Sequence, residues 1–130
     1  MIEVAPGIFT LGALPVAMTL GNVPGEMSSV ITSLQPSGAQ GQGAQHITLQ
    51  HTFISTDPMR PGMFITQDRA VCAPAGANPA TCRVNDVLTI VSGTGVFANA
   101  GGSLRNHGTI DLAGLTVTVS LRGRICGDGL

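Results

Sequence analysis

The chain contains no lysine, no tryptophan and no tyrosine, and charged residues make up only 10% of its 130 residues. Six arginines stand against seven acidic residues, so the net charge is -1 and the chain lacks the basic excess that non-specific binding to DNA or RNA requires. No apolar run reaches the roughly 20 residues that a membrane-spanning helix needs. These absences exclude a general nucleic-acid-binding protein and a helical membrane protein.

The abundant residues favour strands and turns. The chain has 18 glycines and 8 prolines, and it is rich in Thr, Val and Ile but poor in the Lys and Glu that fill exposed helix faces. No stretch combines a helical apolar period with capping residues. We therefore predict one all-β domain spanning residues 1–130. Because so few charges cover its surface, we also expect a homo-oligomer, a dimer or trimer.

Alternation of apolar and polar residues at period two predicts the strands. The clear segments are 46–56, 63–69, 83–91, 103–112 and 115–125, with weaker signals at 16–20 and 27–34. A short hairpin is expected at Ala113-Gly114, and the low-complexity segment 35–45 is expected to be a flexible loop. Sequential antiparallel strands must hide their edges, which predicts a small up-and-down β-barrel of about eight strands, with a β-sandwich as the alternative.

The cysteines bear on the compartment. Cys72 and Cys82 bracket a segment with two prolines and no periodicity, which predicts a loop between strands. A disulfide between them would tie the base of this loop and stabilise the fold by roughly 2–3 kcal/mol. Two reduced thiols are the alternative. Cys126 is the odd cysteine, and we expect it to be buried and unreactive.

The N-terminal residues do not resemble a secretory leader. Met1-Ile2-Glu3 carries an acid where a leader carries positive charge, and the apolar stretch 11–20 has no cationic residue before it. Because of the expected disulfide, we predict a secreted or periplasmic protein whose leader is absent from this chain. A cytoplasmic protein is the alternative.

The second half of the chain carries a glycine-rich motif. Residues 92–97 read Ser-Gly-Thr-Gly-Val-Phe, follow an apolar strand and precede the glycines at 101–102. Gly93 and Gly95 would permit tight curvature where a barrel strand bends, and Phe97 would plug the barrel end beside them. The motif is not a phosphate-binding loop, because it lacks the GxxxxGK[ST] and GxGxxG patterns and a following helix. This order of elements resembles the allene oxide cyclase and dirigent β-barrels.

The resemblance covers roughly the last half of the chain. It implies an oligomeric barrel whose shaped cavity holds a reactive apolar intermediate and directs it to one stereochemical outcome, without a metal or an organic cofactor. The chain has no tyrosine. Any catalytic tyrosine of either family is therefore absent, and the specific chemistry of these families does not transfer to this sequence.

Polar side chains interrupt otherwise apolar strand faces at four positions, His51, Gln67, Asp86 and Asn106. Burying such a group without a partner costs roughly 1–3 kcal/mol. In a barrel the four could converge on one cavity. His51 and Asp86 are then predicted to be a general acid–base pair, because a carboxylate orients an imidazole and raises its pKa. Gln67 and Asn106 would hold a substrate oxygen. The alternative is that each group satisfies a neighbour inside the core.

Other residues complete the prediction. We expect Phe53, Met63 and Phe97 to contact the apolar substrate. No metal site is predicted, because His46 and His51 lie on opposite faces of one strand and the chain has no CxxC or HxxxH spacing.

Arg122 and Arg124 share the polar face of the last predicted strand. We expect them to form ion pairs with Asp68 or Asp111 at the surface or at a subunit interface, with binding of a carboxylate ligand as the alternative.

The predicted function is that of a barrel that binds an apolar small molecule and acts as a cofactor-free cyclase or isomerase. A non-catalytic binding or structural barrel, with its interior filled by its own side chains, is the alternative.

Overall fold

The computed structural model describes all residues except 1, 6–7, 11–15, 37–43, 76–77 and 112–115. Every element in the described part of the chain is a strand, and all of them belong to one antiparallel sheet. The strands are β1 (Ile2–Ala5), β2 (Ile8–Thr10), β3 (Val16–Leu20), β4 (Val23–Pro36), β5 (Gln45–Ser55), β6 (Gly62–Ala75), β7 (Asn78–Gly95), β8 (Gly101–Asp111) and β9 (Thr116–Cys126). The prediction of an all-β fold is confirmed.

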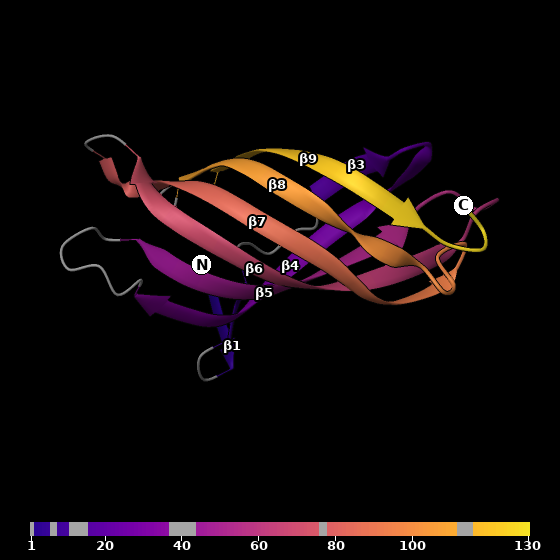
Figure 1. Cartoon of the computed structure of the whole chain (residues 1–130), viewed down its shortest axis with the longest axis horizontal. Coiled ribbons are helices and arrows are strands. Elements are labelled where there is room, and N and C mark those ends of the chain that lie inside the picture. The colour runs from indigo at the N-terminus through magenta and orange to yellow at the C-terminus, as the bar shows by residue number, and fades with distance from the viewer. Residues whose placement is uncertain (1, 6–7, 11–15, 37–43, 76–77, 112–115) are drawn as a thin grey trace.

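The sheet is an up-and-down meander curled into a half-barrel (Figure 1). Its strand order is β1-β2-β4-β5-β6-β7-β8-β9, and β3 pairs with β4 beside β2. In the described residues no backbone pairing joins β9 to β1 or β3. Side chains of β3 and β9 nevertheless pack against the same core cluster.

The predicted strands differ from the observed ones mainly in length. The five clear alternating segments correspond to β5 to β9. The short strands β1 and β2 were not predicted. Strand β4 begins at Val23 because Gly21 and Asn22 alone form the turn after β3. Gly21 has a φ of 61°, which suits a two-residue hairpin turn. The expected hairpin at 113–114 lies outside the described residues.

The core consists of two clusters at different heights along the strands. The disulfide-end cluster contains Ile31, Ile47, Leu49, Ala70, Cys72, Cys82, Val84 and Ile110. The phenylalanine cluster contains Val23, Met27, Phe53, Phe64, Ile90 and Phe97. Strands β5, β6 and β7 contribute side chains to both clusters, so the polar residues between them on the same inward face lie inside the fold.

The phenylalanine cluster depends on a close approach of two segments. Phe53 and Phe64 stack with ring centroids 5.2 Å apart, and Phe97 packs edge-on against both, at 5.7 and 5.0 Å. A side chain at Gly93 would collide with the backbone carbonyl of Phe97, and Gly95 has a φ of 61°. The Gly-Thr-Gly motif therefore lets the chain bend so that Phe97 is buried at this end of the sheet.

The predicted disulfide between Cys72 and Cys82 is present, with the Cα atoms 5.4 Å apart. The segment between them is not mainly a loop, however, because β6 extends to Ala75 and β7 begins at Asn78. The disulfide thus links two neighbouring strands from inside the fold. Such a bond is typical of proteins in oxidising compartments. No helix in the described part of the chain is long and apolar enough to cross a membrane.

Cys126 is exposed, so the prediction that it is buried is wrong. It follows Arg122 and Arg124 at steps of two on β9. Because side chains of a strand alternate between faces, this spacing places Cys126 on the same outer face as the two arginines.

Candidate functional site

A belt of polar side chains crosses the interior between the two core clusters. On β5, His51 lies between Leu49 of the disulfide-end cluster and Phe53 of the phenylalanine cluster, and the inward polar residues of β6 and β7 lie between the clusters in the same way. We call this group the polar belt. It consists of His51 on β5, Thr66 and Asp68 on β6, Asp86 on β7 and Asn106 on β8.

The backbone around His51 departs from a regular ladder. Residue pairing between β5 and β6 runs to Leu49 opposite Asp68 and resumes at Thr52 opposite Ile65. Between these pairs the His51 amide donates a hydrogen bond to the Thr66 hydroxyl, over 3.1 Å. The buried Thr66 hydroxyl therefore pairs the His51 amide, while alternation with Leu49 and Phe53 directs the His51 side chain inward.

His51 and Asp68 form a hydrogen-bonded pair inside the fold. Nδ1 of His51 bonds Oδ2 of Asp68, and the side chains are 12% and 0% exposed respectively. An ionised carboxylate only accepts hydrogen bonds, so Nδ1 carries the proton and Nε2 is the free ring nitrogen. The second oxygen of Asp68, Oδ1, is buried without a hydrogen-bond partner among the described residues.

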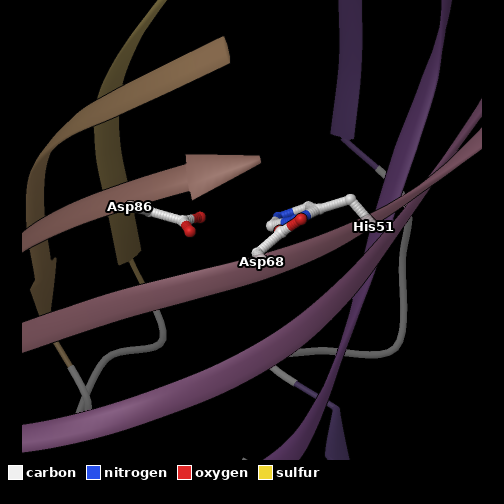
Figure 2. Close-up of side chains that lie close together, drawn as sticks. All are labelled: His51, Asp68 and Asp86. Carbon is white, nitrogen blue, oxygen red and sulfur yellow. The ribbon is translucent and has the colours of Figure 1, made fainter. Parts of the chain in front are cut away.

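Asp86 approaches this pair from the next strand. Figure 2 shows its carboxylate directed toward the His51 ring and Asp68, and one polar atom from each of the three residues lies within 4.8 Å of the others. Burial and the negative charge of Asp68 raise the pKa of Asp86 from 3.8 to about 7, against smaller opposing effects of His51 and of a hydrogen bond with Asn106. Asp86 therefore exchanges a proton near neutral pH.

Three oxygens of the polar belt remain unpaired. Oδ1 of Asp68, of Asp86 and of Asn106 are all buried and have no hydrogen-bond partner in the described part of the chain. Leaving buried acceptors unpaired is costly, so such a group needs an explanation. A bound molecule that donates hydrogen bonds would satisfy these oxygens.

The belt offers two kinds of chemistry. A basic imidazole nitrogen beside a carboxylic acid that titrates near neutrality can move protons in both directions. The same imidazole and carboxylates are also groups that ligate divalent cations. Such a group is assembled from three strands, so the spacing of residues along any single strand does not predict it.

The structure brings together three of the four predicted polar residues. His51 and Asp86 are adjacent, and Asn106 is the register partner of Asp86 on β8. Gln67 is different: it is exposed on the outer face, because Thr66 and Asp68 occupy the inward positions of β6. The prediction that Gln67 lines the interior is therefore wrong.

Of the three residues predicted to contact an apolar substrate, two lie inside the fold and one does not. Phe53 and Phe97 are buried, with 0% and 1% exposure, in the phenylalanine cluster. Met63 is half-buried on the outer side, opposite Ile54 and Thr94, so its expected contact with an interior substrate is not available. The segment 63–65 is apolar at every position, and its alternation therefore does not identify the inward face.

Asp68 is the site residue that sequence reasoning missed. It was expected to pair with Arg122 or Arg124 at the surface, but it is buried and bonded to His51. A signal was available in the sequence. Counting back in steps of two from the disulfide-forming Cys72, which must face Cys82, gives Ala70 and then Asp68 on the same inward face.

A groove of about 400 Å³ lies beside the phenylalanine cluster, between the β3–β4 turn and β9. Leu104 and Leu121 in its wall flank Asn106, since Leu104 is two residues away on β8 and Leu121 is the register partner of Asn106 on β9. The groove therefore lies next to the position of Asn106 in the sheet, although no residue of the polar belt is part of its lining. Its apolar lining comprises Leu20, Val23, Phe97, Leu104, Leu121, Ile125 and Leu130.

Comparison of this chain with protein-family models, with curated proteins and with solved structures finds no match. The function is therefore argued from the polar belt and the groove.

Proposed function

We propose that the protein binds an apolar small molecule and catalyses a cofactor-free proton transfer that isomerises or cyclises it. The observation that carries this proposal is the convergence of His51, Asp68 and Asp86 from three neighbouring strands, inside the fold, with unpaired carboxylate oxygens. Unpaired buried polar groups with a perturbed pKa are typical of functional sites.

Each member of the belt has a separate role in this reaction. Asp68 holds Nδ1–H of His51 and so presents Nε2 as the base that removes a proton from carbon. Asp86, protonated up to about neutral pH, donates a proton to the oxygen or carbon that gains electron density. One proton leaves the substrate and one returns, so the product is an isomer and no oxidant or reductant is consumed.

The groove supports an apolar substrate. Its volume of about 400 Å³ lies within the range of small-molecule sites, which is roughly 300–1,000 Å³. Phe97 contributes to its wall and packs on Phe53, so both predicted aromatic residues would shape the apolar end of the site. Asn106, which is two residues from Leu104 and opposite Leu121, would accept a hydrogen bond from the substrate through its unpaired Oδ1.

The resemblance to allene oxide cyclase and dirigent barrels supports the same class of reaction, in which a shaped cavity directs a reactive apolar intermediate. The proposal includes an oligomer, because few charges cover the outer surface. It also includes secretion, since the Cys72–Cys82 disulfide suits an oxidising compartment.

One observation favours the non-catalytic alternative. Phe53, Phe64 and Phe97 pack on one another, so much of one end of the interior is filled by the protein's own side chains. In that case the polar belt would only fix the packing of the two clusters, and the groove would bind a ligand without changing it.

Deuterium exchange distinguishes the two functions. The protein is incubated in D2O with a panel of apolar ketones and enones, and deuterium incorporation at carbon is followed by mass spectrometry. We expect exchange with the intact protein and a loss of about 100-fold or more in His51→Ala. His46→Ala is the matched control, because His46 is exposed on the outer face of the same strand. Binding without exchange, or exchange that survives His51→Ala, contradicts the catalytic proposal.

A further inference from the structure

The outer face of strands β6 to β9 carries most of the arginines, with Asp111 at the far end of β8 on the same face, although the chain as a whole has a net charge of -1. The sixth arginine, Arg60, is paired with Asp57 in the turn after β5, with 3.1 Å between Nε and Oδ2. Two of the acids, Asp68 and Asp86, are buried on the inner side of the sheet. Five of the six arginines are exposed on these four strands: Arg69, Arg83, Arg105, Arg122 and Arg124.

Like charges stand directly opposite each other at one point on this face. Arg105 on β8 is the register partner of Arg122 on β9, and Arg124 is the partner of Ser103. Neither Arg105 nor Arg122 takes part in the salt bridges found among the described residues. Like charges at opposed positions of an antiparallel pair repel each other, so this arrangement lacks a counter-charge within the described chain.

A hollow of about 590 Å³ lies over this pair of arginines. Its lining contains no acidic residue and is rich in hydrogen-bond donors: Ser103, Arg105, His107, Ser120, Arg122 and Gly123. His107 is held in place by Asn85 on β7, with 2.6 Å between Nδ1 and the side-chain oxygen. The Asn85 oxygen accepts this hydrogen bond, so the imidazole has a fixed orientation at the edge of the hollow.

We propose that this hollow binds a tetrahedral oxyanion, the phosphate or sulfate group of a small molecule. Directly opposed residues on antiparallel strands have Cβ atoms only about 4.5–5.5 Å apart, so the guanidinium groups of Arg105 and Arg122 can both reach one anion. A guanidinium group binds such oxygens through bidentate hydrogen bonds, and the hydroxyls of Ser103 and Ser120 add two more donors. The bound anion supplies the missing counter-charge.

The inference goes beyond the proposed function, because the hollow and the polar belt belong to opposite faces of the sheet. His107, Arg105 and Arg122 alternate with the inward residues of β8 and β9. His51→Ala, which removes the proposed base, is therefore expected to leave anion binding unchanged, and each proposal can fail without the other.

Calorimetric titration of the whole chain with inorganic phosphate and inorganic sulfate, at constant ionic strength, tests the site. We expect saturable binding of one anion per chain, weakened by about tenfold or more in Arg105→Gln and in Arg122→Gln. Arg83→Gln is the matched control. Arg83 is exposed on the same face opposite Thr109 but does not line the hollow, so its loss should change the affinity less than about twofold.

Further titrations distinguish a free inorganic anion from an esterified phosphate or sulfate group. Phenyl phosphate and phenyl sulfate are titrated beside the inorganic ions, and tighter binding of an ester indicates that the site takes an esterified group. Arg105→Lys keeps the positive charge but removes the planar guanidinium group, so it should also weaken anion binding. Absence of saturable binding, or equal weakening by Arg83→Gln and Arg105→Gln, overturns the proposal. Circular dichroism of each variant verifies that it folds.

Discussion

The carboxylate of Asp68 bonds Nδ1 of His51 across neighbouring strands from a side chain with no exposed surface. Removing one partner of such a buried pair leaves the other uncompensated, which is costly. The pair therefore fixes the position of the imidazole and leaves Nε2 as its free ring nitrogen, within a group that also contains Asp86.

Asp68→Asn tests whether this pair positions a catalytic base. Asparagine has nearly the same shape, but its oxygen accepts a weaker hydrogen bond and its amide can donate, which favours the wrong imidazole tautomer. We expect the rate of deuterium exchange at carbon to fall by about 100-fold or more, with little change in ligand affinity. A loss of affinity with an unchanged rate constant would contradict a positioning role for Asp68.

For Asp86→Asn we predict a gain in stability at neutral and higher pH. The folded-state pKa of Asp86, about 7, is higher than its ordinary value of 3.8, so the folded protein retains this proton more tightly than the unfolded chain. Asp86 therefore lowers the free energy of unfolding progressively as the pH rises from about 4 to about 7, and the loss is complete above that range. Asparagine, which stays neutral, avoids this loss.

Urea denaturation at several pH values measures the effect. We expect Asp86→Asn to be more stable than the unmodified protein at pH 8 by at least about 1 kcal/mol, with a difference that shrinks toward pH 4. The same variant should lose deuterium exchange. Higher stability with lost activity is the signature of a residue retained for function. A variant that is less stable at pH 8 would show that the charged carboxylate is well compensated in the fold.

The sequence placed His51, Asp86 and Asn106 on inward faces because each lies between apolar residues at steps of two along its strand. It did not place Asp68, because the start of that strand is apolar on both sides and its inward face is ambiguous. The short strands β1 and β2 were missed for a related reason: three or four residues are too few to establish a period.

The register between neighbouring strands could not be predicted from the alternation of residues along each strand. A shift in register between Ile65 and Thr66 changes the pairing of β6 with β7. It brings Asp86 opposite Ala70, which is two residues from Asp68. Irregularities of this kind depend on contacts between strands, and no residue pattern along one strand specifies them. The proximity of His51 to Asp86 was thus a hypothesis that only the three-dimensional arrangement could support.

Gly93→Ala probes the packing that closes the phenylalanine end. A Cβ at this position would meet the carbonyl of Phe97, which is backbone and cannot move aside cheaply. We expect a loss of about 2–4 kcal/mol in the free energy of unfolding. Gly101→Ala is the control, because a Cβ there meets nothing within 4 Å, and its effect should stay within about 0.5 kcal/mol. Equal effects of the two variants would refute the packing explanation.

The double variant Cys72→Ala, Cys82→Ala measures the contribution of the disulfide at the opposite end. The bridged residues are 10 apart in sequence, for which the chain-entropy model gives about 3 kcal/mol. Alanine keeps the cluster apolar, so unpaired polar groups do not add to the loss. We expect urea denaturation to show a decrease of that size, together with insensitivity of the variant to reducing agents.

Cys126→Ser is the control and should leave the free energy of unfolding unchanged, because that thiol is exposed. If reduction of the unmodified protein left its stability unchanged, the disulfide would contribute nothing to the stability of the fold.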